Sequence, residues 1–200
     1  MENPFSTTLT YSESSVETNS ILDSEVAAMA ESDREASSEQ NSTRDHATSG
    51  VPVLRRAAMD FLARREHSYQ ELTRKLQLKF PDVTPDKIAE VLDALRSEKL
   101  QSDDRFAESW VRYRQNRGFG YMHILADLKE RGVSSQTINR YLFADDDTWH
   151  QSVENLIKKR LNDGETLEFG SKSHQKLTRY LQSRGFAPQE IQRALRIRIA

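Results

Sequence analysis

One pattern decides the fold, and it occurs three times: Val83-Thr84-Pro85-Asp86-Lys87-Ile88 followed by Leu92, Val133-Ser134-Ser135-Gln136-Thr137-Ile138 followed by Leu142, and Phe186-Ala187-Pro188-Gln189-Glu190-Ile191 followed by Leu195. Thr84 and Ser134 are residues that cap helices, and Pro85 and Pro188 suit a first helical position, where a missing N–H costs nothing. The isoleucine and the leucine lie four residues apart and therefore face one core. Each stretch predicts the start of an amphipathic helix.

A second predicted helix lies upstream of each of these stretches. Its core-facing pairs are Leu72 and Leu76, Ile124 and Leu128, and Leu177 and Leu181. The first copy opens on Ser68-Tyr69-Gln70-Glu71, a capping box. The other two copies end on Arg131-Gly132 and Arg184-Gly185, where glycine suits a left-handed helix end. The first copy ends differently, on Lys79-Phe80-Pro81.

A further helix precedes these two in every copy, and each of its apolar stripes ends on arginine: Leu54, Ala58, Phe61 and Arg65; Phe106, Trp110, Tyr113 and Arg117; Trp149, Val153, Leu156 and Arg160. Ser102 and Asp147 are the expected caps of the second and third. About ten extra residues, Leu161–Gly170, separate the first two helices of the third copy. We therefore predict an all-α fold of three tandem three-helix repeats, 53–101, 102–146 and 147–200, that stack into an elongated curved array.

The first fifty residues differ in composition from the rest of the chain. They hold ten acidic and two basic residues, a charge of −8, whereas the whole chain carries −2 and residues 51–200 therefore carry +6. They are rich in Ser and Thr and poor in aromatics, so we predict a disordered tail. Such a tail can simply aid solubility, or it can act as an acidic decoy that competes with nucleic acid.

Several functional classes are disfavoured by what the sequence lacks. It has no cysteine, no HExxH, no phosphate-binding glycine motif and no pair of nucleophile and base. Carboxylate clusters such as Asp103-Asp104 lie where helices begin, where they favour the helix dipole. No signal peptide or long apolar run is visible. We expect a cytoplasmic monomer that binds macromolecules, with no membrane contact, catalytic residues, metal or cofactor.

The candidate contact residues are cations that recur at matched positions. Rows of equivalent cations suit phosphate groups at regular spacing or an acidic protein surface. We assign them to contacts with a partner: Arg65, Arg117, Arg160, Lys79, Arg131, Arg184, Arg114, Lys129 and Lys176.

Three stretches resemble the signatures of the bacterial regulatory protein RecX: residues 65–76, reading REHSYQELTRKL; residues 100–112, reading LQSDDRFAESWVR, continued by residues 124–133; and Arg184-Gly185-Phe186. The resemblance covers about residues 53–198. The chain departs from the pattern at Lys99, where the family often has glycine.

The resemblance implies a partner and a function. RecX proteins modulate, and usually inhibit, the RecA recombinase in DNA repair and the SOS response. They bind the RecA filament on single-stranded DNA and lower its recombinase, ATPase and coprotease activities, and some bind DNA directly, so we also expect single-stranded DNA and, more weakly, duplex as partners. A sequence-specific duplex DNA-binding regulator of helix-turn-helix type, acting without RecA, is the alternative.

Overall fold

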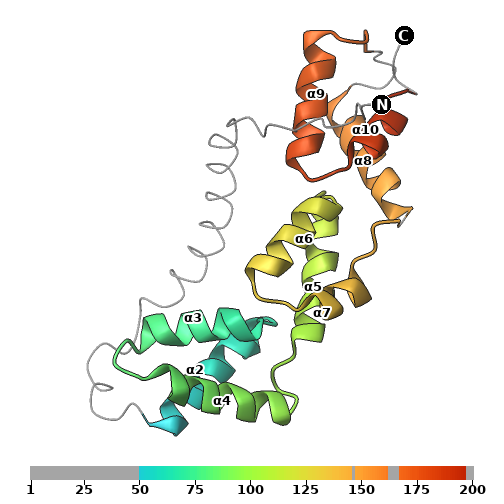
Figure 1. Cartoon of the computed structure of the whole chain (residues 1–200). Coiled ribbons are helices and arrows are strands. Elements are labelled where there is room, and N and C mark those ends of the chain that lie inside the picture. Colours follow the sequence, from blue (N-terminus) through green and yellow to red (C-terminus); the bar gives the residue numbers. More distant parts are fainter. Residues whose placement is uncertain (1–49, 146, 162–166, 197–200) are drawn as a thin grey trace, which may run out of the picture. The chain divides into compact units, whose positions relative to one another are not determined.

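The computed structural model describes residues 50–145, 147–161 and 167–196, and these ranges contain nine helices and no β-strand. The all-α prediction is confirmed, and the helices form successive groups along the chain (Figure 1). Residues 1–49 of the acidic tail and residues 162–166 of the extra segment in the third copy lie outside the described residues. None of the described helices is long and apolar enough to cross a membrane.

The first group comprises α2 (Val51–Arg64), α3 (Tyr69–Lys79) and α4 (Pro85–Ser97), and all three pack on one another. The hydroxyl of Ser68 accepts the N–H of Glu71 and so caps α3 as expected. Leu54, Leu72 and Ile88 are completely buried between the helices. The spacing that predicted a shared apolar face therefore produces a core.

The second group comprises α5 (Asp103–Asn116), α6 (Tyr121–Glu130) and α7 (Ser135–Tyr141). Ser102 and Ser134 cap α5 and α7 through their side chains. Phe106 and Trp110 of α5 stack at 5.7 Å between ring centroids and fill the centre of this group. The α5 stripe thus packs as its spacing predicts.

The third group comprises α8 (Thr148–Arg160), α9 (Lys172–Ser183) and α10 (Pro188–Arg196), and α10 packs against both α8 and α9. Trp149, Leu181 and Ile191 are buried there. The prediction that Asp147 caps α8 is wrong, since the backbone of Asp147 is already helical and its side chain makes no capping hydrogen bond. Ser171 caps α9 instead, by accepting the N–H of His174.

Lys99 follows α4 with a φ of 60°, the one non-glycine residue with positive φ in the described ranges. The N–H of Leu100 donates to the carbonyl of Leu95 at 2.9 Å, which closes the helix end around it. Glycine adopts this conformation without strain. The site where the chain departs from the family pattern is therefore a left-handed helix end.

Candidate anion-binding site at the joints between repeats

The first joint connects the first and second groups of helices through the end of α6. The hydroxyl of Ser68 donates to the carbonyl of Arg131 at 2.7 Å, and the guanidinium of Arg74 donates to the carbonyl of Glu130 at 3.3 Å. Gly132, with a φ of 72°, lies directly against the side chain of Gln70. The Arg-Gly turn that ends α6 therefore packs on the beginning of α3 in the preceding repeat.

The second joint repeats this arrangement one unit further along. The N–H of Gly120 donates to the carbonyl of Arg184 at 2.7 Å, and the N–H of Met122 donates to the carbonyl of Gly185 at 3.1 Å. A Cβ on Gly185, whose φ is 85°, would overlap the backbone of His123. Each Arg-Gly turn thus closes its helix and contacts the preceding repeat.

Carboxylates neutralise the arginines of the first joint. Glu71 accepts from Arg65 at 3.2 Å and from His67 at 2.9 Å, and its other oxygen lies 3.4 Å from Arg131. Burial would raise the pKa of the Glu71 carboxyl, but the hydrogen bond from His67 and the charges of Arg65 and Arg131 outweigh it and lower that pKa. Burial also lowers the pKa of the Arg131 guanidinium, which lies 4.2 Å from the centroid of the Trp110 ring.

Arg114 is buried beside this joint. Its side chain is 7% exposed, and its Nε donates to Asp127 at 2.6 Å, while Trp110 donates to the same carboxylate oxygen at 3.3 Å. A guanidinium enclosed in this way offers almost no surface to a partner. Arg114 and Arg131 are therefore engaged inside the fold and do not belong to the candidate contact surface.

The arginines of the second joint are held by aromatic rings. Arg160 lies 3.6 Å and Arg184 5.4 Å from the centroid of the Tyr180 ring. Arg184 also donates to the carbonyl of Arg117 at 3.5 Å, and Arg117 donates to the hydroxyl of Tyr113 at 2.8 Å. None of the three arginines forms an ion pair with a carboxylate of the described residues.

Together Arg117, Arg160 and Arg184 form what we call the arginine cluster. Arg117 and Arg160 are exposed, and Arg184 is half-buried. A guanidinium that lies on an aromatic face keeps its N–H groups at the ring edge, where they can donate in pairs to phosphate or carboxylate oxygens. The second joint is therefore the candidate anion-binding site of the described chain.

The remaining predicted contacts lie elsewhere on the surface. Lys79 is exposed and lies 6.0 Å from the centroid of Phe61 and 5.8 Å from that of Phe80, while Lys129 and Lys176 are exposed on α6 and α9. Arg65 is half-buried against Glu71. The structure thus gathers three of the nine predicted cations into one cluster and engages three others with carboxylates.

Sequence reasoning missed the groups that decide which arginines are engaged. Asp127 lies between Ile124 and Leu128 on the buried face of α6, and a carboxylate in that position signals a buried cationic partner. Tyr113 and Tyr180 precede Arg117 and Arg184 by four residues, the spacing of side chains that touch on a helix. Both signals are present in the sequence.

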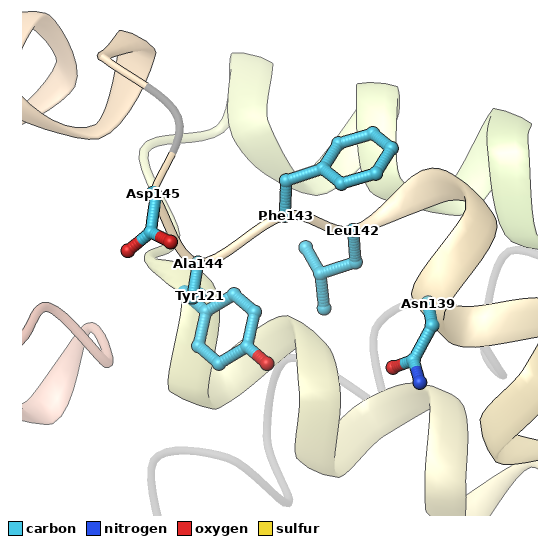
Figure 2. A pocket seen from close by; sticks show the side chains of 6 residues that line it. All are labelled: Tyr121, Asn139, Leu142, Phe143, Ala144 and Asp145. Carbon is cyan, nitrogen blue, oxygen red and sulfur yellow. The ribbon is translucent and has the colours of Figure 1, made fainter.

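An open hollow of about 510 Å³ lies in the second repeat, where α7 ends. Its lining residues, drawn in Figure 2, are Tyr121, Asn139, Leu142, Phe143, Ala144 and Asp145. The ring of Tyr121 meets Trp149 edge-on at 6.4 Å between centroids. One carboxylate and no cation line this hollow, so it does not extend the anion-binding site.

Comparison with known proteins points to one family. A family model described as RecX, first three-helix domain, matches residues 55–95, and one described as RecX, second three-helix domain, matches residues 102–142. Regulatory protein RecX of Pseudomonas entomophila (strain L48) is 38% identical over 147 residues, which cover 72% of this chain and 92% of that protein. Its counterpart in Chromohalobacter salexigens is 38% identical over 138 residues, covering 69% and 88%.

Solved structures show the same fold. The crystal structure of RecX from Lactobacillus salivarius superposes with a TM-score of 0.61 at 22% identity and covers 74% of this chain and 95% of that one. A second crystal structure, of regulatory protein RecX, gives a TM-score of 0.58 at 18% identity, with 72% of each chain covered.

Proposed function

The chain belongs to the RecX family of regulatory proteins, and from this membership we propose that it binds the RecA filament on single-stranded DNA and lowers the recombinase, ATPase and coprotease activities of RecA. In this role it acts in the cytoplasm during DNA repair and the SOS response. It acts by binding, as a monomer and without a cofactor.

The observation that carries this proposal is the arginine cluster at the second joint. Arg117 and Arg160 end the first helices of two successive repeats, and Arg184 ends a second helix. Arg160 and Arg184 meet at the ring of Tyr180, and Arg184 donates to the backbone carbonyl of Arg117, whose own guanidinium lies on Tyr113. Because no described carboxylate neutralises them, their charge is available to a partner. A RecA filament on DNA presents both phosphate groups and protein carboxylates, the two anions that arginine binds best.

Direct contacts connect the second and third repeats at this surface. Backbone hydrogen bonds and a closely packed glycine form the second joint, which brings arginines of neighbouring repeats together. In our proposal the protein lies along the filament and bridges subunits, and it thereby alters their addition and loss.

The test is the ATPase of RecA on single-stranded DNA, with the protein titrated in. We expect inhibition at fewer than one molecule of this protein per RecA, because one bridging molecule affects several subunits. The competing possibility is a regulator that binds one duplex sequence and acts without RecA. Unchanged ATPase together with a preference for one duplex sequence would favour that regulator.

A further inference from the structure

Helix α9 differs in charge from the helices that hold the same place in the first two repeats. Lys172, Lys176 and Arg179 are exposed on it, and its twelve residues include no Asp or Glu. Lys176 directly precedes the buried core residue Leu177, as Glu71 precedes its core leucine in α3 and His123 its core isoleucine in α6, so the three positions correspond. The position that neutralises arginines in the first joint is therefore cationic in the third repeat.

The face of α9 that includes Lys176 corresponds to a face that is covered in the first two repeats. In α3 and α6 it receives an Arg-Gly turn, through Ser68 in one and Gly120 in the other. In α9 the corresponding residues are Ser173, Gln175, Lys176 and Arg179, and all four are exposed. Within the described part of the chain no further repeat packs on α9, so its cations face solvent.

These cations lead into the arginine cluster. Lys172, Lys176 and Tyr180 are spaced four residues apart and so lie along one side of α9. The row ends at the ring of Tyr180, where Arg160 and Arg184 lie. Residues 147–200 hold ten Lys and Arg against six Asp and Glu, which gives +4 of the +6 carried by residues 51–200.

We propose that this cationic row, Lys172, Lys176 and Arg179 together with the arginine cluster, binds the phosphate groups of single-stranded nucleic acid, and that it does so without RecA. The inference deepens the proposed function, on which it rests, by assigning its nucleic-acid contact to the third repeat.

A single strand fits this surface better than a duplex does. Cations four residues apart on a helix repeat about every 6 Å along its axis. A flexible strand can adapt its backbone to that repeat, whereas duplex DNA is stiff over about 50 nm. Arginines cover the ring of Tyr180, so the row offers charge but no free stacking platform. Binding is therefore insensitive to base sequence and strongly sensitive to salt.

The experiment measures binding of the full chain to a fluorescent oligothymidylate, in the absence of RecA, across a series of salt concentrations. The test variant is Lys172→Gln/Lys176→Gln/Arg179→Gln, in which glutamine preserves helix propensity. The control is Arg56→Gln/Arg64→Gln/Lys87→Gln, which removes three exposed cations from the first repeat and therefore has the same net charge. Circular dichroism checks that both variants are folded.

We expect the slope of log affinity against log salt to fall by about 2 in the test variant, since each phosphate contact contributes roughly 0.7. At 0.1 M salt this corresponds to a loss of affinity of about 100-fold. The control should stay within about threefold of the wild type.

Two results would overturn the inference. One is equal loss in both variants, which would show that only net charge matters. The other is unchanged oligothymidylate binding in the test variant. If that variant also fails to inhibit the RecA ATPase, the row contacts RecA, and the proposed function stands while the inference does not.

Discussion

The backbone N–H of Gly120 donates to the backbone carbonyl of Arg184 at 2.7 Å, so the second and third repeats are bonded main chain to main chain. The first joint uses the hydroxyl of Ser68 for the same purpose. The arginines that close both joints are thus positioned by backbone geometry, which substitutions can test.

Gly185→Ala should destabilise the protein more than Gly170→Ala does. Both glycines have φ near 80°, so alanine at either position costs about 1 kcal/mol of conformational strain. A Cβ at Gly170 meets no atom within 4 Å, whereas at Gly185 it overlaps the backbone of His123. We expect urea denaturation to show an additional loss of about 1–3 kcal/mol for Gly185→Ala. Equal losses of stability in the two variants would mean that the backbone at the joint shifts to accommodate the added Cβ at no cost.

Lys99→Gly should stabilise the first repeat. Lys99 holds a φ of 60°, which costs a non-glycine residue about 1–2 kcal/mol, while glycine loses up to about 1 kcal/mol of backbone entropy on folding. The difference predicts a gain of about 0.5–1 kcal/mol in the free energy of unfolding, measured by urea titration. Glu90→Gly, at an exposed position in the interior of α4, should lower stability and serves as the contrast.

Asp127→Ala should be strongly destabilising, because it leaves the buried guanidinium of Arg114 without its carboxylate. The two side chains are 12% and 7% exposed, and breaking a pair of this kind costs about 3–5 kcal/mol. Glu108→Ala breaks the exposed pair with Arg112 and should cost less than about 0.5 kcal/mol. A loss below about 1 kcal/mol for Asp127→Ala, by thermal or urea denaturation, would contradict the engagement of Arg114 in the core.

Stability should decline as pH falls below about 6.5, in part through His67. Burial lowers the pKa of this imidazole, and the positive charges of Arg65 and Lys75 lower it further. The hydrogen bond to Glu71 acts in the opposite direction but does not outweigh them. Below about pH 6.5 the unfolded chain therefore binds a proton at His67 more readily than the folded chain does. The contribution of His67 to stability is fully present above its unfolded pKa of about 6.5 and is lost as pH falls.

Comparison of the wild type with His67→Gln isolates this contribution, because the other histidines are common to both proteins. Between pH 7 and 5 the free energy of unfolding of the wild type should fall more steeply than that of the variant. The window ends above the range in which Glu71, whose pKa is lowered, becomes protonated. Parallel curves would show that His67 does not titrate on unfolding.

Sequence periodicity was sufficient to predict the helices, since Leu72, Ile124 and Leu177 occupy the same buried position in their repeats. It could not predict which arginines stay free. Arg65 and Arg117 are equivalent by spacing, yet only Arg65 meets a carboxylate, because the side chain that follows in the next helix is Glu71 in one repeat and His123 in the other. Whether an arginine is free to bind a partner therefore depends on which side chains tertiary packing brings next to it.

Left-handed geometry was predictable where glycine marks it, as at Gly132 and Gly185, but not at Lys99, whose residue type gives no sign of a positive φ. The sequence pattern also could not predict the contacts at the joints. Their hydrogen bonds connect residues more than fifty positions apart, such as Ser68 and Arg131, and mostly involve backbone groups that every residue carries.

The central claim is that the arginine cluster is the surface through which this chain inhibits RecA. The most direct measurement is RecA ATPase on single-stranded DNA, titrated with Arg117→Gln/Arg160→Gln and with the charge-matched control Arg56→Gln/Arg64→Gln. Our account predicts that the cluster variant, folded by circular dichroism, needs at least about tenfold more protein for half-inhibition, since two charged contacts are lost. The control should act like the wild type. Full inhibition by the folded cluster variant would contradict the account.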